Sequence, residues 1–435
     1  MSRTAMFRTA MSRTGAALST RARLHLCRIC GSTDDSTLPK AARMPDIVIL
    51  SAVRTAIGSF GGALASLPPI TLATEVTRAA LARAGVEGVR IDHVVFGHVI
   101  NTEPRDMYLS RVAAIEAGIP ESVPAMNVNR LCGSGLQAVV AAMQGLLLGD
   151  GRFALAGGAE SMSRAPYILP AARFGQKMGD TTALDMMTGA LTCPFGTGHM
   201  GVTAENVADR DGITRGRQDA FALQSQTRAA LAIAEGRFVG QIVPIDSPSR
   251  KGTIRFEVDE HPRPTTAEAL AALRPVFRKT GSVTAGNSSG INDGAAALVL
   301  ARMSPDLASL GLTPRARIMG YAHAGVDPAL MGIGPIPAVR ALCARLGMAA
   351  TDFDLVESNE AFAAQALAVS KDLNLDPARV NPNGGAIALG HPVGASGAIL
   401  VVKALHELER TGGQTALITM CIGGGQGIAL AIQRM

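Results

Sequence analysis

Apolar residues fall into two kinds of stretch along this chain. Short, nearly continuous apolar runs predict buried strands, at residues 47–53, 94–97, 153–159 and 296–300. Stretches with small and apolar residues at helical spacing predict helices, at residues 71–84, 111–117, 136–148, 203–209 and 217–235. Because helices and strands alternate, we expect an α/β protein with a mainly parallel sheet that helices cover on both faces.

An internal repeat links the two ends of the chain. Residues 81–85 end in a glycine suited to a helix C-cap, and Asp92 follows seven residues later. Residues 343–347 repeat the pattern, with Asp354 seven residues after the glycine. The repeat predicts two similar halves that meet face to face, although two unrelated strand–helix units would give the same short echo.

Length and charge exclude some classes of function. The 435 residues suffice for two or three domains with a large core. Residues 1–43 hold eight of the 41 basic and two of the 35 acidic residues, which is the whole formal net charge of +6. The rest of the chain is balanced, so we expect no nucleic-acid partner. No apolar run approaches the roughly 18 residues of a membrane span, and we expect no membrane partner.

Residues 1–43 are rich in Arg, Ser, Thr and Ala, with no acidic residue before Asp34. This composition is typical of a mitochondrial transit peptide. Alternatively, Met44 is the true start, since it stands just before the first predicted strand. Residues 1–44 are then an N-terminal extension in either case. We expect a cytoplasmic protein, or a mitochondrial one if residues 1–43 are a transit peptide.

The six cysteines are scattered, at positions 27, 30, 132, 193, 343 and 421. They form no disulfide framework, which indicates a reducing compartment. Cys27 and Cys30 have the spacing of metal ligands. No second pair follows to complete the ligand set, so we expect no metal.

Cys132 stands between a polar turn and a helix of small residues. Gly133, Ser134 and Gly135 follow it, so the thiol should lie at a helix N-terminus. Unpaired backbone N–H groups and the helix dipole favour a thiolate there. The pattern predicts a nucleophile, and a buried structural cysteine beside a packing glycine is the alternative.

Three more motif stretches lie near the C-terminus, at residues 357–363, 383–397 and 420–427, and the last two are punctuated by glycines. With the stretch around Cys132, they resemble the motifs of the thiolase family, of the acetyl-CoA acetyltransferase or β-ketothiolase kind, in the family's order. The resemblance runs from about Asp46 to Met435. It implies a thiolase-like duplicated α/β/α/β/α five-layered fold with an inserted loop domain.

The resemblance also implies domain boundaries. The N-terminal half, with Cys132, comprises residues 45–161 and 289–313. Residues 162–288 are the loop domain, which binds coenzyme A. Residues 314–435 are the C-terminal half, with His391 and Cys421.

Roles for the matching residues follow from the family's chemistry. Cys132 is implied to carry the acyl group with His391 as its base, while Cys421, with a pKa brought near neutral, moves the α-proton. The backbone N–H groups of Cys132 and Gly423 are implied as one oxyanion site, and Asn359 with His391 as the other. A core role for Cys421 and a helix-capping role for Asn359 and its neighbour Glu360 are the alternatives.

Four residues are implied to contact coenzyme A or the acyl chain. His199, Met200 and Ser289 match positions along the pantetheine and acyl tunnel. Arg263 matches an arginine near the nucleotide phosphates. Its two flanking prolines depart from the family pattern, and a solvated surface arginine is the alternative.

The expected function is reversible condensation of two acetyl-CoA to acetoacetyl-CoA and CoA, by ping-pong acyl transfer through Cys132. Residues 97–108 and 326–334 resemble broad-range β-ketothiolases of polyhydroxyalkanoate-forming bacteria, so longer 3-ketoacyl-CoA thioesters are further candidate substrates. The resemblance implies no cofactor besides these coenzyme A thioesters, and a homotetramer built as a dimer of dimers.

Two alternatives stay open within the same superfamily. One is a decarboxylating ketoacyl synthase, which usually lacks the second cysteine. The other is a non-catalytic acyl-CoA-binding protein, against which the intact Cys132, His391 and Cys421 argue.

Overall fold

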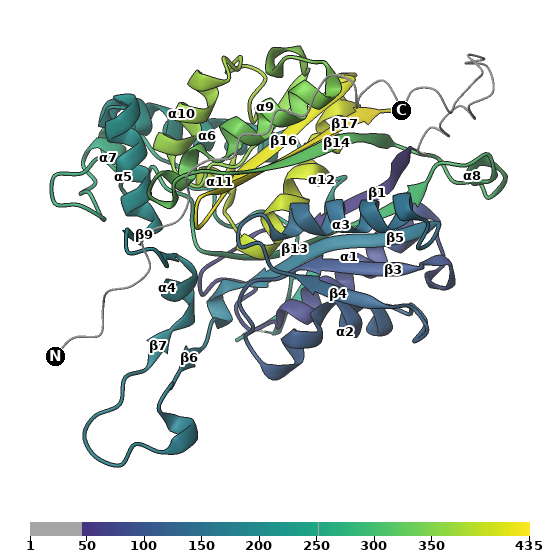
Figure 1. The fold of residues 1–435 in the computed structure, drawn as a ribbon, viewed down its shortest axis with the longest axis horizontal. Helices are drawn as coiled ribbons and strands as arrows, with labels where there is room; N and C mark the ends of the chain where they lie inside the picture. The colour runs from purple at the N-terminus through teal and green to yellow at the C-terminus, as the bar shows by residue number, and fades with distance from the viewer. Residues whose placement is uncertain (1–45, 251) are drawn as a thin grey trace, which may run out of the picture. The chain divides into compact units, whose positions relative to one another are not determined.

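The computed structural model describes residues 46–250 and 252–435 (Figure 1). The predicted N-terminal extension, with Cys27 and Cys30, lies outside the described residues. We call the elements on residues 46–161 and 292–309 the first half, and those on residues 316–434 the second half.

The first half begins and ends with long strands that pair with each other. Its elements are β1 (Ile47–Thr55), β2 (Gly58–Ser59), α1 (Pro69–Ala84), η1 (Gly88–Arg90), β3 (His93–Gly97), η2 (Pro104–Tyr108), α2 (Leu109–Glu116), β4 (Ala125–Val128), α3 (Ser134–Leu148), β5 (Phe153–Ser161), β13 (Asn292–Arg302) and α8 (Asp306–Ser309).

The second half ends in a hairpin. Its elements are β14 (Ala316–Gly325), η5 (Pro328–Ile333), α9 (Pro335–Leu346), η6 (Ala350–Asp352), β15 (Leu355–Ser358), α10 (Ala363–Asp372), α11 (Ala386–Leu389), α12 (Val393–Thr411), β16 (Thr415–Ile422) and β17 (Gln426–Arg434).

Between β5 and β13 the chain forms a region of short strands and of helices that differ in length. They are η3 (Met162–Arg164), β6 (Tyr167–Ile168), η4 (Ala172–Phe174), β7 (Leu184–Asp185), α4 (Met186–Ala190), β8 (Thr192–Cys193), β9 (Gly198–His199), α5 (Met200–Asp211), α6 (Arg215–Ala234), β10 (Ile242–Val243), β11 (Ile245–Ser249), β12 (Gly252–Phe256) and α7 (Ala267–Ala271). The strand pair β6 and β7 leads into an excursion that projects away from the sheets (Figure 1).

The strands of the two halves follow the same order. Hydrogen bonding joins β1-β13-β5-β3-β4 in the first half and β14-β17-β16-β15 in the second. In both halves the first two neighbouring pairs are antiparallel and the third is parallel. Strands β1 and β14 connect the halves through the pairs Val48–Arg317 and Ile49–Ala316. The predicted duplication is confirmed.

The expectation of a mainly parallel sheet is wrong. The parallel pairs are β3 with β4 and β5, β15 with β16, and β1 with the short β10, while the longest pairings are antiparallel. Residues 423–425 alone separate β16 from β17, and so short a turn can only join antiparallel strands. Apolar runs indicate that a strand is buried, but not in which direction its neighbour runs.

The two repeated aspartates, Asp92 and Asp354, form equivalent hydrogen bonds in the two halves. A carboxylate oxygen of Asp92 accepts two backbone hydrogen bonds at the start of β5, at 2.7 and 3.0 Å. A carboxylate oxygen of Asp354 accepts two at the start of β16, at 2.9 and 3.0 Å. Each aspartate therefore anchors the strand that leads toward the site.

Helices α3 and α12 form the layer between the two halves. A Cβ on Gly135 would lie 2.7 Å from the backbone nitrogen of Ala398, and one on Gly397 would lie 2.3 Å from that of Leu136. Only glycine permits such close helix contact. Because the contact lies near the start of both helices, it brings together the turns that precede them, which hold Cys132 and His391.

The expectation that no apolar run approaches the length of a membrane span is wrong for helix α3. The segment Leu131–Leu148 is long and apolar enough to cross a membrane by length and composition, so an apolar run of that size does exist. However, 56% of the segment is buried, and α3 packs on α12, β3 and β5. Its apolar character is that of a core helix.

Candidate active site

Cys132 lies in the turn between β4 and α3. Ser134 closes this turn, because its hydroxyl accepts from the backbone N–H of Arg130 at 2.9 Å and donates to the carbonyl of Leu131 at 2.6 Å. Leu131 has a positive φ of 46°, which leucine rarely adopts. A Cβ on Gly133 would lie 2.5 Å from the side chain of Ile422, so glycine lets the turn lie against the end of β16.

His391 lies in the turn before α12, and first-half side chains hold this turn. The amide oxygen of Asn292 accepts from the backbone N–H of His391 at 2.9 Å. The buried carboxylate of Glu160 accepts from the backbone N–H of Gly394 at 2.9 Å. The position of His391 therefore depends on both halves.

Cys421 lies near the end of β16, just before the turn into β17. Gly424 and Gly425 in this turn have φ values of 82° and 84°, which side chains other than glycine rarely adopt. The backbone N–H of Gly423 forms a hydrogen bond with the thiol of Cys132. The hairpin of β16 and β17 thus places Cys421 and the backbone donor to Cys132 in the same site.

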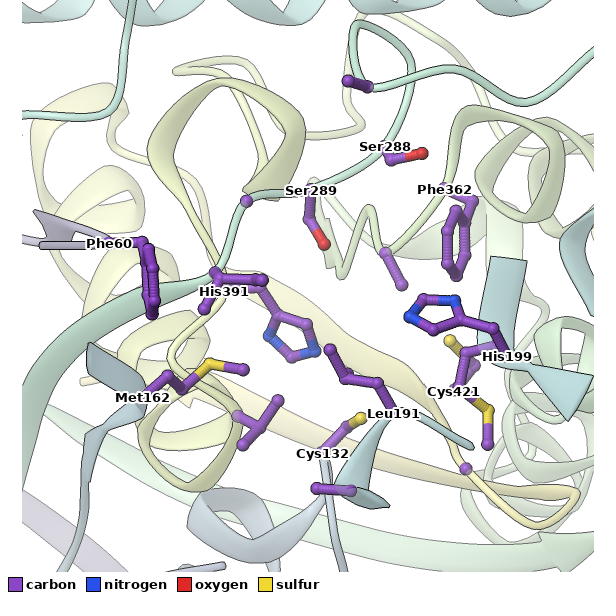
Figure 2. A pocket seen from close by; sticks show the side chains of 18 of the residues that line it. Phe60, Cys132, Met162, Leu191, His199, Ser288, Ser289, Phe362, His391 and Cys421 are labelled. Atoms are coloured by element: carbon purple, nitrogen blue, oxygen red, sulfur yellow. The ribbon is translucent and has the colours of Figure 1, made fainter. Parts of the chain in front are cut away.

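These residues line a cavity of about 570 Å³. Eight of the nine predicted site residues line it, namely Cys132, His391, Cys421, Gly423, His199, Met200, Arg263 and Ser289. The ninth, Asn359, lies behind the histidine, with its amide nitrogen 3.4 Å from Nε2 of His391. Figure 2 shows the Cys132 thiol and the His391 ring pointing toward one another, with Cys421 beside His199 across the same cavity.

His391 is a neutral base in this environment. Burial lowers its pKa to about 4. Its Nδ1 lies 2.6 Å from the hydroxyl oxygen of Ser396, which also lies 2.8 Å from the carbonyl of Pro392. Ser396 contacts Nδ1, so Nε2 is the ring nitrogen that remains to accept a proton from the cavity. Nε2 lies on the side of Asn359.

The expectation that the surroundings of Cys132 favour a thiolate is wrong for the free protein. Hydrogen bonds from the backbone N–H groups of Gly423 and Cys132 lower the pKa of the thiol, but burial raises it by more, and Glu160 raises it further. In the free protein, burial and the nearby Cys132 also raise the pKa of Cys421 well above its ordinary value, and a pKa brought near neutral beside a bound substrate stays a prediction. Both groups therefore rest as thiols, and a thiolate needs a base beside it.

The two N–H groups predicted as an oxyanion site, those of Cys132 and Gly423, both contact the Cys132 sulfur. An acyl group on that sulfur would have its carbonyl oxygen next to the same donors. Their role, like that of the other site residues, stays a prediction.

Asn359 and Glu360 do not cap the helix that follows them. Helix α10 begins at Ala363 with Phe362 as N-cap, and no side chain caps it. The buried carboxylate of Glu360 instead accepts from the hydroxyl of Ser225 at 2.7 Å and the amide of Asn381 at 2.8 Å. Burial raises its pKa. Glu360 thus ties the loop after β15 to α6.

The four residues expected to contact coenzyme A or the acyl chain line the same cavity as the reactive groups. The ring of His199 stacks on that of Phe277 at 4.8 Å, and its Nδ1 accepts from the first turn of α5 at 3.1 Å. Arg263 is exposed, and its guanidinium donates to the carbonyl of Ala285 at 3.2 Å. Its charge is therefore available at the edge of the cavity.

Sequence reasoning missed the side chains that hold the histidine. Asn292 and Glu160 are far from His391 in the chain, and no local pattern singled them out. Ser396 stands inside the stretch 383–397, five residues after His391, and one turn of helix brings it back to the ring. In residues 46–250 and 252–435, no group of three or more His, Cys, Asp and Glu side chains is placed to hold a metal ion.

Comparison with known proteins agrees with this geometry. Residues 47–304 match the family model of the thiolase N-terminal domain, and residues 312–434 match that of the thiolase C-terminal domain. The chain belongs to the thiolase family, and it is an acyltransferase.

Individual relatives cover nearly the whole chain. It is 57% identical to the beta-ketothiolase BktB of Cupriavidus necator over 392 residues, which are 90% of this chain and 99% of the relative. The crystal structure of the Bacillus anthracis acetyl-CoA acetyltransferase matches with a TM-score of 0.88 and 46% identity, over 90% of this chain and 99% of that one. Human mitochondrial 3-ketoacyl-CoA thiolase in complex with CoA matches with a TM-score of 0.86 and 43% identity, over 90% of this chain and 98% of that one.

Proposed function

We propose that this protein catalyses the reversible Claisen condensation of two acetyl-CoA to acetoacetyl-CoA and CoA, by ping-pong transfer of an acyl group through Cys132. One observation carries the proposal, namely that Cys132, His391 and Cys421 converge on one cavity. Acyl transfer requires a nucleophile with a base, and carbon–carbon bond formation requires a second proton acceptor. Coenzyme A thioesters are the substrates, without a further cofactor.

In the first half-reaction the Cys132 sulfur attacks the thioester carbon of acetyl-CoA while its proton passes to Nε2 of His391. The bond from this carbon to the coenzyme A sulfur breaks, and the leaving thiolate takes the proton of Cys421. The acyl-enzyme then has a Cys421 thiolate and a protonated His391. The net charge of the cavity is unchanged, which is important where burial penalises each charge.

In the second half-reaction the Cys421 thiolate removes a proton from the α-carbon of a second acetyl-CoA. This carbon bonds to the acyl carbon on Cys132, the carbon–sulfur bond breaks, and the Cys132 sulfur takes the proton back from His391. Nε2–H of His391 and the Asn359 amide, 3.4 Å apart, can both donate to the oxygen of the second thioester.

Longer 3-ketoacyl-CoA thioesters are proposed as additional substrates for thiolysis. The relative in Cupriavidus necator is named a beta-ketothiolase, and the human structure is named a 3-ketoacyl-CoA thiolase. Phe60, Met162 and Leu191 add apolar surface to the cavity around the reacting groups (Figure 2).

A substrate panel tests the proposal. The purified full-length protein should convert acetyl-CoA to acetoacetyl-CoA and should cleave acetoacetyl-CoA when CoA is added. Extension of the panel to longer 3-ketoacyl-CoA thioesters measures the chain-length range. Turnover that requires malonyl-CoA and releases CO₂ would instead show a decarboxylating ketoacyl synthase, and binding of acyl-CoA without turnover would show a non-catalytic protein.

We also propose that the protein assembles as a homotetramer, a dimer of dimers. Strand β4 is at the edge of the first-half sheet, and exposed apolar side chains lie on it and next to it, including Met107, Tyr108 and Met126. A second set lies on the β6–β7 excursion, where Phe174 and Met178 are 90% and 88% exposed. Two separate apolar surfaces fit two kinds of contact between copies, and sedimentation equilibrium tests the number of copies.

A cytoplasmic location is proposed because the mechanism needs two reduced thiols. The four cysteines of the described residues are all free. Import into mitochondria is the alternative if residues 1–43 act as a transit peptide, and fractionation of cells that express the full-length chain distinguishes the two.

A further inference from the structure

The hydroxyl of Ser396 lies between two partners behind the proposed catalytic centre. Its oxygen is 2.6 Å from Nδ1 of His391 and 2.8 Å from the carbonyl oxygen of Pro392. The Ser396 side chain is buried, and it does not line the 570 Å³ cavity. A serine hydroxyl has one proton to donate, so its two contacts cannot both be donations.

Only two proton arrangements satisfy this geometry. In the first, the hydroxyl donates to Pro392 and accepts from a protonated Nδ1 of His391, which leaves a lone pair on Nε2. In the second, the hydroxyl donates to Nδ1, the contact with Pro392 loses its proton, and Nε2 carries a hydrogen. The first arrangement makes both hydrogen bonds and the second makes only one.

The other side of the ring also favours the first arrangement. The amide nitrogen of Asn359 lies 3.4 Å from Nε2 of His391, and an amide nitrogen can only donate. It finds an acceptor there only if Nε2 has its lone pair. Three contacts on two sides of the ring thus agree on one tautomer, in which Nε2 is free to take a proton from Cys132.

We propose that Ser396 is a positioning residue, which holds His391 as the Nδ1–H tautomer and aims Nε2 at the Cys132 thiol. The inference rests on the proposed function, in which His391 is the base for acylation. Ser396 contacts no substrate. It acts through the ring, in the way that a hydrogen-bonded partner sets the tautomer of other functional histidines.

The same hydrogen bond serves the charged state of the histidine. When Nε2 takes the Cys132 proton, the imidazolium forms on a buried side chain, where charge is penalised. The Nδ1–H donation to Ser396 then becomes charge-assisted, which makes it shorter and stronger than a hydrogen bond between neutral groups. Without the hydroxyl, a buried N–H group would have no partner just when it carries the most charge.

The surroundings allow a sharp test by substitution. A small cavity of about 20 Å³ borders Ser396, with Asn359, Ile399 and Lys403 among its walls. The ammonium group of Lys403 donates to the carboxylate of Glu357 at 2.7 Å and to the carbonyl of Gly384 at 2.8 Å. It therefore does not take the place of the Ser396 hydroxyl as the partner of Nδ1. The cavity offers space for one methyl group, so Ser396→Thr can keep the hydroxyl in place.

The experiment compares Ser396→Ala, Ser396→Thr and a control, Ser51→Ala, in the full-length protein. Ser51 is also buried and donates to a carbonyl, that of Ala80 at 2.7 Å, but in the strand β1. The readouts are kcat and KM for acetyl exchange between acetyl-CoA and CoA, thermal unfolding, and the nitrogen NMR shifts of ¹⁵N-histidine-labelled protein, with His391 assigned by its loss in His391→Gln.

We expect Ser396→Ala to lower kcat about 10- to 100-fold, by analogy with the loss found when a hydrogen-bond partner that orients a metal-bound histidine is removed. KM should change less than about threefold, Ser396→Thr should recover most of the activity, and Ser51→Ala should keep full activity. The wild-type spectrum should show Nδ1 protonated and Nε2 unprotonated. A kcat within twofold of wild type in a folded Ser396→Ala protein would overturn the proposal, and so would an Nε2–H tautomer in the free wild-type protein.

The two proposals fail in different ways. If the protein transfers no acyl group at all, the proposed function is wrong, and the kinetic readout has no baseline. The nitrogen NMR shifts of wild-type His391 still test whether the ring has the Nδ1–H tautomer that Ser396 is proposed to hold. If Ser396→Ala does not fold, Ser396→Thr and the wild-type spectrum remain decisive.

Discussion

The first and second halves of this protein have one scaffold and different chemistry. Their strands follow the same order and directions, and each has a register irregularity in its first strand, at residues 49–51 in β1 and 318–320 in β14. Asp92 and Asp354 anchor the equivalent strands β5 and β16. The turns before α3 and α12 are also equivalent, yet one holds the thiol of Cys132 and the other the imidazole of His391.

The halves differ most where β5 and β16 end. The anchoring aspartates and the pairs His93–Ala154 and Leu355–Ala416 align these strands, and Cys421 then corresponds to Ala159. Strand β16 turns back at once through residues 423–425, whereas β5 leads into the long region before β13. The scaffold sets where a side chain can reach the cavity, and the residue at each position sets what it does there.

The largest expected effect comes from Cys132→Ala, which removes the reactive group that only the first half supplies. Acetyl exchange and condensation should both fall on the order of 10⁴-fold or more, as for other lost nucleophiles. After wild-type protein is mixed with acetoacetyl-CoA, mass spectrometry should find an acetyl group on the Cys132 peptide. Cys343→Ala is a suitable control because its thiol is buried in the second-half core, outside the cavity. An adduct found only on Cys193 or Cys343 would contradict the assignment.

Cys421→Ser tests the cysteine that has no counterpart in the first half. Condensation should fall by about 10² to 10⁴, the range for a missing general base, because a serine hydroxyl is too weak an acid to exchange the α-proton. Acetyl exchange should survive better, since His391 can return the Cys132 proton to the leaving CoA. Rates of both reactions on the same preparation provide the measurement. Equal losses would show either that Cys421 serves structure or that its proton is as indispensable for acetyl exchange as for condensation, and the two-cysteine division would be wrong.

Asp92→Ala and Asp354→Ala test whether the halves are equivalent as scaffolds. Each variant removes an acceptor of two backbone hydrogen bonds, so each should lower the free energy of unfolding by about 1 to 2 kcal/mol. Asp92 should have the larger effect because it is less exposed. Urea unfolding measures the loss, and kcat of the folded variants should stay within about twofold of wild type. Destabilisation by one variant alone would show that the repeated aspartates do not do equivalent work.

The smallest effect is expected from removal of residues 1–43, which belong to neither half. A chain that begins at Met44 should keep kcat and its thermal unfolding temperature, because the first strand starts at Ile47 and the site residues within the described part of the chain all come later. Steady-state kinetics of both chains make the comparison. Lower activity in a chain that stays folded and unaggregated would show that the extension contributes to function.

Much of the site could be predicted from the sequence, because its reactive groups stand in local patterns. A cysteine before a small-residue helix, a histidine between glycines and a cysteine before three glycines each reflect a backbone that must come close to a ligand or another helix. The repeat at Asp92 and Asp354 was visible for a similar reason. Each aspartate stands seven residues after the glycine that ends the preceding helix, and each accepts hydrogen bonds from the backbone at the start of a strand.

Other features were decided only by the tertiary structure. Strand direction depends on which strands become neighbours, and the thiol pKa values depend on how much protein surrounds each sulfur. Asn292 and Glu160 reach the histidine turn from the other half, so no local pattern could connect them with His391. Ser396 stood in a motif, but its task depends on which of its two neighbours receives its one hydroxyl proton. The sequence determines local geometry and residue chemistry, whereas desolvation and hydrogen bonds between distant segments arise only when the halves pack together.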